Sequence, residues 1–297
     1  MLNILLFLFL GTLGWGVSLY LIKILLISLT PTEIVLYRAL IGAFSLLLLA
    51  KLLRLKPGNL TDLLRDGLVV GLFNMALPFY LTSLAEKSVP SALASVLNGL
   101  TPLCAFVLSL CFFSAKPKFS YLNFLSLSLG LLGIVLVNLD ALQGQGKVLH
   151  LLALVATCLS YGFAANYVKS CARSKEPILV AIVATASASL LMLAFQLSSS
   201  PTLLSWGYPR TLAQLGSLLW LGLVGTGLSL YLYCLLIRRV GAVTASMTTY
   251  LMTITGISMG VFFLGERMST LVILGCLCII TSLIITNHVA ALERLFS

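Results

Sequence analysis

Residues 71–115 read GLFNMALPFYLTSLAEKSVPSALASVLNGLTPLCAFVLSLCFFSA, and residues 222–266 read GLVGTGLSLYLYCLLIRRVGAVTASMTTYLMTITGISMGVFFLGE. The second stretch follows the first at an offset of 151 residues, aligns with it without a gap, and matches it at about a quarter of the positions. The identical residues are Gly71, Leu72, Leu77, Tyr80, Leu81, Leu84, Val89, Ala94, Ser95, Leu100 and Phe112. A single register kept over this length indicates an internal repeat.

The repeat extends to the beginning of the chain with a slightly different offset. Moving 146 residues along the sequence carries Trp15 onto Tyr161 and Pro31 onto Pro177. The change from 146 to 151 indicates a connecting loop of different length in each half. The whole chain is therefore predicted to consist of two related halves.

The composition identifies the solvent that surrounds this repeat. Hydrophobic residues make up 60% of the 297 residues, charged residues only 9%, and the mean hydropathy is +1.12. A water-soluble protein of this size needs more polar surface than that. We therefore expect an all-α integral membrane protein.

The apolar stretches between charged or Pro/Gly-rich breaks are each about as long as the roughly 20 residues needed to cross a bilayer. Ten are predicted, near 3–23, 33–52, 67–86, 90–113, 120–138, 148–169, 177–196, 213–236, 241–264 and 269–288. They divide into a first five-helix repeat over residues 1–140 and a second over residues 147–290. Because five is odd, the second repeat starts on the opposite side of the membrane, so the two halves are inverted. Inverted repeats are typical of secondary transporters, whose solute site lies between the halves.

Basic residues predict the orientation, because they accumulate in cytoplasmic loops. With the N-terminus inside, the inner loops hold Lys51, Arg54, Lys56, Arg65, Lys116, Lys118, Lys169, Arg173, Lys175, Arg238, Arg239 and Arg294. The outer loops hold only Lys23, Lys87, Lys147, Arg210 and Arg267. Both termini are therefore expected in the cytoplasm. Basic residues in loops beside anionic lipid also explain the net charge of +10. The sequence shows no basic surface with interspersed aromatic residues, so we do not expect nucleic-acid binding.

Polar residues on predicted helix faces are candidates for the solute site. A projection of the fourth span at 100° per residue places Asn98 among small side chains, and Thr249 lies on the equivalent face of the ninth span. The third span has Asn74 on a face with Gly67 and Gly71. The glycines also suit close helix packing, whereas a buried amide needs a partner in a network or a cavity.

The ordered set of motifs resembles the EamA family of the drug/metabolite transporter superfamily. The motifs are Trp15-Gly16 in the first span, Pro31 followed by Arg38 in the second, Pro102 in the fourth and Gly265-Glu266 at the end of the ninth. The resemblance implies transport of small organic solutes, often amino acids or related metabolites, and often export. It also implies a central cavity lined by spans 1, 3, 4, 6, 8 and 9. Ser114-Ala115 and Thr253 depart from the family pattern, so symmetric solute contacts are not expected.

Charged residues at membrane depth are few. Arg38 and Glu266 are candidates for gating or coupling. Glu33 has a structural explanation, because Thr30-Pro31-Thr32-Glu33 fits a helix capping box. No acidic residue or histidine is predicted in mid-span, so proton coupling through a midplane group is not indicated.

Aromatic and amide side chains complete the predicted solute site. Trp15 and Tyr161 occupy equivalent positions of the two repeats, as do Tyr80 and Tyr231, and Asn166 adds an amide in the sixth span. Rings supply contact area for an organic solute. Tyr80 and Tyr231 project away from the polar faces, so lipid-facing packing is an alternative for them.

These features predict a carrier of small organic solutes in a bacterial inner membrane, working by alternating access. A nucleotide-sugar or other metabolite carrier of the same superfamily, and a channel, remain alternatives. An enzyme is not expected, because the spans offer no catalytic dyad or metal-ligating cluster. We expect no cofactor or metal, since the cysteines suit small apolar packing. The solute and membrane lipid are the expected partners, and a homodimer stays open.

Overall fold

The computed structural model describes residues 2–55, 59–112, 147–170, 176–199 and 206–265, together with single residues between 121 and 136 and between 269 and 285. These residues form helices, and none of the elements found among them is a strand. Eight helical stretches in the described residues are long and apolar enough to cross a membrane. The predicted spans at 120–138 and 269–288 fall mostly outside the described residues, so the total of ten stays a prediction.

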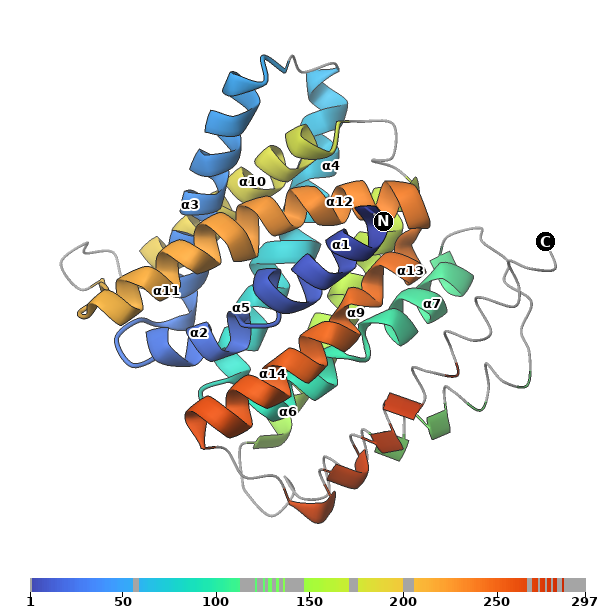
Figure 1. Cartoon of the computed structure of the whole chain (residues 1–297). Helices are drawn as coiled ribbons and strands as arrows, with labels where there is room; N and C mark the ends of the chain where they lie inside the picture. Colours follow the sequence, from blue (N-terminus) through green and yellow to red (C-terminus); the bar gives the residue numbers. More distant parts are fainter. Residues whose placement is uncertain are drawn as a thin grey trace.

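Figure 1 shows how the helices pack into one bundle. The first four spans comprise α1 (Leu2–Phe9), η1 (Leu10–Gly14) and α2 (Ser18–Leu25); α3 (Pro31–Leu52); α4 (Leu60–Gly71), η2 (Leu72–Ala76) and α5 (Leu77–Ala85); and α6 (Ser91–Asn98) and α7 (Thr101–Phe112). The later spans comprise α9 (Lys147–Ser170); α10 (Pro177–Ser199); α11 (Leu212–Gly222), η4 (Leu223–Leu228) and α12 (Ser229–Val240); and α13 (Ala242–Ser246) and α14 (Thr248–Leu264). The elements labelled η are π-helical turns.

The third span begins earlier than the sequence predicted, at Leu60 rather than at 67. Its first turn is capped, because the Asn59 side chain accepts a hydrogen bond from the Asp62 backbone. Three charged residues expected in a loop, Asp62, Arg65 and Asp66, therefore lie within α4. The Asp66 carboxylate is fully buried and accepts hydrogen bonds from the Tyr167 hydroxyl (3.0 Å) and from Arg65 Nε (3.2 Å). These polar partners allow a charged turn to continue the helix.

The repeat has direct structural counterparts. Pro31 and Pro177, related by the offset of 146, are the first residues of α3 and α10. The capping box predicted before α3 is confirmed, since the Thr30 and Glu33 side chains each accept a hydrogen bond from the other residue's backbone. The π-helical turns η2 and η4 begin at positions related by the offset of 151. Such turns are rare and occur frequently at functional sites.

The fourth span is broken at its centre, although one regular helix was predicted there from the sequence. α6 ends at Asn98 and α7 begins at Thr101. Pro102 explains the break, because it has no N–H to donate to the Asn98 carbonyl one turn earlier. The Thr101 hydroxyl donates to that carbonyl instead, at 2.8 Å. The ninth span is also interrupted, at Met247 between α13 and α14.

Helices of the two halves pack against each other throughout the bundle. α10 lies against α3 and α4, α9 against α5 and α7, α14 against α6, and α3 against η4. Glycine residues allow neighbouring helices to approach each other closely. A Cβ atom at Gly67 would overlap Val183 of α10, and one at Gly256 would overlap Ser95 of α6. These contacts agree with the packing explanation for the small-residue faces.

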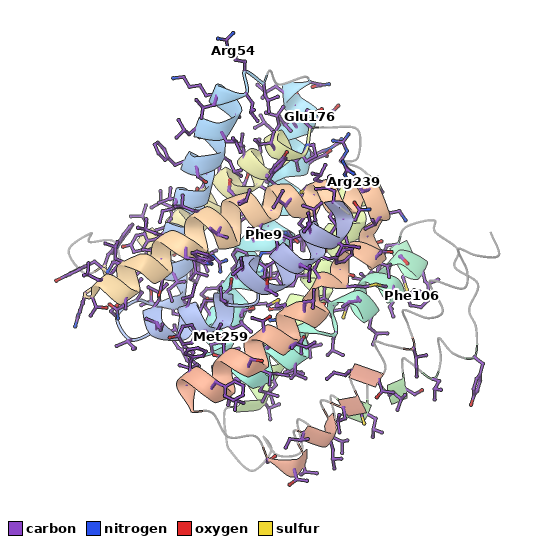
Figure 2. The ribbon with its side chains drawn as sticks, in the orientation of Figure 1. Phe9, Arg54, Phe106, Glu176, Arg239 and Met259 are labelled. Carbon is purple, nitrogen blue, oxygen red and sulfur yellow. The ribbon has the colours of Figure 1, made fainter. Side chains whose placement is uncertain are left out.

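The outer surface carries large apolar side chains, as Figure 2 shows. Phe44 is 71% exposed and Phe262 81% exposed, which suits contact with lipid chains. Arg54, Glu176 and Arg239 lie toward one end of the bundle, in the upper part of Figure 2. This end is the one that the basic-residue rule predicts to be cytoplasmic.

Candidate functional site

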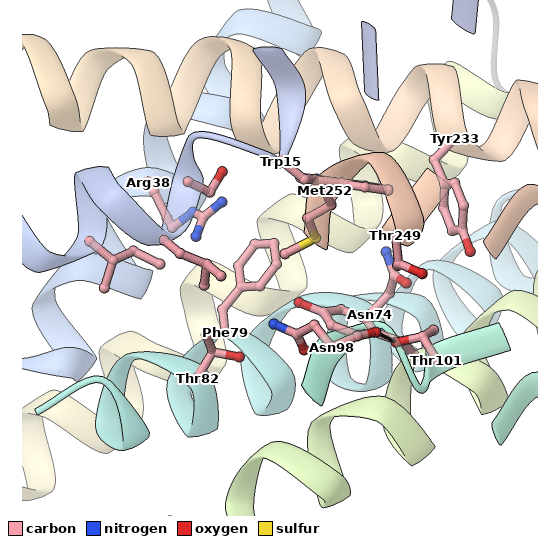
Figure 3. A pocket seen from close by; sticks show the side chains of 14 residues that line it. Trp15, Arg38, Asn74, Phe79, Thr82, Asn98, Thr101, Tyr233, Thr249 and Met252 are labelled. Atoms are coloured by element: carbon pink, nitrogen blue, oxygen red, sulfur yellow. Dashed lines mark hydrogen bonds between the residues drawn. The ribbon is translucent and has the colours of Figure 1, made fainter. Parts of the chain in front are cut away.

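An internal cavity of about 50 Å³ lies between the two halves (Figure 3). It is lined by Trp15, Ser18, Leu19, Ile22, Arg38, Asn74, Phe79, Thr82, Asn98, Thr101, Tyr161, Tyr233, Thr249 and Met252. These residues come from α3 and from six other spans. The sequence-predicted spans 1, 3, 4, 6, 8 and 9 all contribute to the wall. A volume of this size holds a few water molecules.

The two repeats contribute equivalent positions to the cavity wall. The offset of 151 residues relates Asn98 to Thr249, Thr82 to Tyr233 and Thr101 to Met252, and all six line the cavity. The offset of 146 relates Trp15 to Tyr161, which line it as well. Within each pair the two side chains differ. The two repeats thus place equivalent positions at the cavity but different side chains at those positions. Contacts of the two halves with a solute are therefore expected to differ.

Arg38 is the only charged residue among those that line the cavity. Its side chain is 2% exposed, its Nε donates to the Thr226 hydroxyl at 2.8 Å, and its Nη2 donates to the Gly225 carbonyl at 3.3 Å. The guanidinium carbon lies 3.9 Å from the centre of the Phe79 ring. Stacking on a ring stabilises a desolvated cation. Arg38 belongs to α3 of the first half and its hydrogen-bond partners to η4 of the second.

The π-helical turn η4 makes a backbone carbonyl available to side chains. In a π-helical turn the hydrogen bonds run from residue i to residue i+5, which disturbs the regular pairing of carbonyl groups. The Gly225 carbonyl accepts from Trp15 Nε1 at 3.1 Å as well as from Arg38. The Trp15 ring also packs edge-on against Tyr233, with ring centres 4.9 Å apart. Trp15 and Arg38, from two different spans, are therefore both held to one residue of η4.

Two polar atoms at the cavity have no hydrogen-bond partner among the described residues: Asn98 Oδ1 and Thr82 Oγ1. Asn98 is 1% exposed and Thr82 4% exposed. A buried polar atom without a partner is unfavourable by about 1–3 kcal/mol. Figure 3 shows Asn98 and Asn74 beside each other along one wall, with Arg38 toward one end and Tyr233 toward the other. The cavity thus offers both unused acceptors and unused donors to an occupant.

Six residues predicted from the sequence lie together at this cavity: Trp15, Arg38, Asn74, Asn98, Tyr161 and Thr249. Their proposed contacts with a solute stay predictions. Glu266, the second predicted gating residue, lies outside the described residues.

Three other predicted residues do not line the cavity. Tyr80 packs against Phe195 of α10, with ring centres 5.5 Å apart, and Tyr231 packs against the hydrophobic core. The Asn166 amide donates to the carbonyls of Ala105 (2.8 Å) and Gly162 (2.9 Å), which ties α9 to α7. These contacts give all three a role in packing.

Several lining residues were not predicted from the sequence, among them Phe79, Thr82, Thr101, Tyr233 and Met252. The repeat itself carried a usable signal, because Thr82 pairs with Tyr233 and Thr101 with Met252 at the offset of 151. No comparable signal in the sequence indicates that Phe79 lies under Arg38. Within the part of the chain that the structure describes, no group of three or more His, Cys, Asp or Glu side chains is placed to bind a metal.

A cavity with a mainly apolar wall and a few polar side chains, placed between repeated halves of an apolar helical bundle, is the arrangement of an integral membrane transporter. Comparison with known proteins agrees with this class. The family model of the EamA-like transporter family matches residues 2–139 and again residues 148–288. The chain belongs to the EamA-like transporter family.

Individual relatives extend the comparison. The uncharacterized transporter YdfC of Bacillus subtilis (strain 168) is 26% identical over 251 residues, which are 83% of this chain and 78% of that protein. A solved structure, described only as the crystal structure of a protein, superposes with a TM-score of 0.66 at 16% sequence identity. The match covers 93% of this chain and 98% of that one. It shows that the two proteins share a fold.

Proposed function

We propose that this transporter moves small organic solutes, such as amino acids or related metabolites, without ATP and by alternating access, with export favoured over uptake. The observation that supports this most directly is the cavity between the two halves, whose few polar side chains lie at positions that the repeat duplicates. A site at the interface between inverted repeats reaches either side of the membrane when one half tilts against the other.

The size of the cavity supports a conformational change during transport. Pockets for organic ligands usually enclose about 300–1,000 Å³, whereas this cavity has about 50 Å³. We therefore propose that this structure corresponds to a contracted state and that a solute enters only when the halves separate. In the separated state, Asn98 and Thr249 hydrogen-bond the solute, Trp15 and Tyr161 pack against it, and Arg38 biases the gate.

One contact between the halves is well placed to open and close. The Glu33 carboxylate at the start of α3 accepts hydrogen bonds from the Gly207 backbone (2.8 Å) and from the Gln196 amide (3.4 Å). Glu33 belongs to the first half and its two partners to the second. This contact lies at the end of the bundle where α3 begins, which we propose faces away from the cytoplasm. Both termini are then cytoplasmic, in a bacterial inner membrane.

Counterflow in proteoliposomes tests the proposed function. Purified protein is reconstituted into vesicles loaded with a high concentration of one unlabelled amino acid or related metabolite, and uptake of the labelled form is followed without ATP. Exchange that saturates with solute concentration and needs solute on both sides supports a carrier. Flux that rises linearly and does not accelerate by exchange indicates a channel. No flux for any member of a broad panel, with correctly folded protein, contradicts the proposal.

A further inference from the structure

We propose that Arg38 is the receptor for a carboxylate group of the solute, and that the cavity selects carboxylate-bearing organic solutes over neutral and cationic ones of the same shape. This inference rests on the proposed transport function and adds to it the chemical class of the solute and the residue that recognises it.

The first argument is the charge balance of the cavity. A guanidinium removed from water is costly unless an anion compensates it. Arg38 has only neutral hydrogen-bond partners, Thr226 and Gly225, and an aromatic ring. Within the described ranges no carboxylate lies within 4.0 Å of its guanidinium. The buried Glu86, just beyond α5, interacts with Arg38 electrostatically from farther away. A solute carboxylate in the cavity supplies the missing close partner.

The second argument is the number of donors that remain. A guanidinium has five N–H groups arranged as a planar fork. Two of those of Arg38 are used, one at Nε and one at Nη2. The remaining N–H groups, on Nη1 and Nη2, suit a carboxylate, which accepts two parallel hydrogen bonds from such a fork. Lysine cannot reproduce this geometry.

The third argument is the chemistry of the remaining wall. The residues beyond Arg38 include Phe79, Met252 and Leu19, which suit an apolar body, and Asn98, whose Oδ1 accepts from an uncharged or charged donor. The lining contains no Asp, Glu or His. A cationic amine therefore finds no anionic side chain in the wall and is repelled by Arg38.

Binding at Arg38 also links recognition to movement. The hydrogen bond from Arg38 to Thr226 joins α3 of the first half to η4 of the second. A carboxylate bound to the remaining N–H groups draws the guanidinium toward the cavity and so away from Thr226 and Gly225. Occupation of the site therefore weakens a contact that holds the contracted state together. A ligand shifts a conformational equilibrium only through such differential contacts.

The test uses full-length protein purified in an uncharged detergent at constant ionic strength. The probes are three matched sets that differ only in their head group: butanoate, butanamide and butylamine; hexanoate, hexanamide and hexylamine; and 3-phenylpropanoate, 3-phenylpropanamide and 3-phenylpropylamine. Affinity is measured from the concentration dependence of thermal stabilisation. In at least one set we expect the carboxylate to bind about tenfold more tightly than the amide, with the amine weakest. Equal affinities, or no stabilisation by any carboxylate, overturn the inference.

Variants separate recognition from folding. Arg38→Gln should abolish the preference for carboxylate, and Arg38→Lys should retain only part of it. Lys51→Gln removes the same charge from the exposed end of the same helix and should leave the preference unchanged. If Arg38→Gln does not fold, Thr226→Val decides, because it frees the guanidinium and leaves the positive charge. It should bind the carboxylate at least as tightly as the wild-type protein does. Weaker carboxylate binding by Thr226→Val assigns Arg38 a structural role and overturns the inference.

Failure of this inference differs from failure of the proposed function. If counterflow of any solute is present but the affinity series shows no preference for carboxylate, the proposed transport function is supported and carboxylate recognition by Arg38 is wrong. If the affinity series shows the preference but no probe and no solute in the panel is exchanged, carboxylate recognition by Arg38 is supported and the proposed transport function is contradicted.

Discussion

Replacing Glu33 by glutamine should destabilise the protein, because the Glu33 carboxylate is buried and joins three segments. The Glu33 side chain is 2% exposed and accepts three hydrogen bonds, from the Thr30 backbone (2.8 Å), the Gly207 backbone (2.8 Å) and the Gln196 amide (3.4 Å). Glutamine keeps one oxygen and turns an NH2 group toward one of the two backbone N–H groups. That N–H group then has no acceptor.

The magnitude follows from these contacts. A buried donor without an acceptor is unfavourable by about 1–3 kcal/mol, and the remaining bonds lose the extra strength given by the negative charge. We expect Glu33→Gln to lower the free energy of unfolding by about 3 kcal/mol, or to lower the Tm by roughly 6 °C for a chain of this length.

Thermal unfolding of the purified protein in detergent measures the effect. Glu176→Gln is the matched control, because Glu176 is exposed and also precedes a span, at Pro177. Its effect should stay within about 0.5 kcal/mol. If Glu33→Gln is as stable as this control, the carboxylate is not needed at the junction of α3, α10 and the segment before α11, and the reasoning is wrong.

Three further pairs of substitutions test the packing and the site. Gly256→Val should prevent folding, because its Cβ overlaps the facing serine, whereas Gly216→Ala should be tolerated, because no atom lies within 4 Å of the added Cβ; yield and Tm compare the two. Thr101→Val should lower stability by about 1–2 kcal/mol, since it leaves a buried carbonyl without a donor, and Thr101→Ser should restore it; equal Tm values for the two contradict this. Asn166→Ala should lower the Tm, because it loses one hydrogen bond to α7 and one within α9. Asn98→Ala should instead lower transport with little change in Tm, because the Asn98 Oδ1 has no partner to lose. Unchanged transport by Asn98→Ala in purified vesicles removes that residue from the site.

The sequence predicted the bundle well because its strongest signals are local. Pro31 and Pro177 begin helices for the same reason in both halves, since proline has no N–H to lose in the first turn. Apolar length alone located the spans that the structure describes. The start of the third span was misplaced because the charge of Asp66 suggested a loop, and its partner Tyr167 is 101 residues away.

The orientation of helix faces was harder to predict, because the projection assumed a constant 100° per residue. The π-helical turn η2 breaks that period, so Gly67 before it packs against α10 while Asn74 and Thr82 face the cavity. Identity between the repeats was also misleading as a guide to the site. Tyr80 and Tyr231 are identical, yet both serve packing. The cavity lies where the repeats have diverged, because equal positions there carry different chemistry.

The small cavity around Arg38 also bears on the ion gradients of the membrane. Water filling a space of this kind would form part of a path for protons if the space connected both sides of the membrane. A fixed positive charge beside that water repels protons and metal cations, as arginines do in the pores of water channels. The protein without solute is therefore expected to keep protons and metal cations from entering this space.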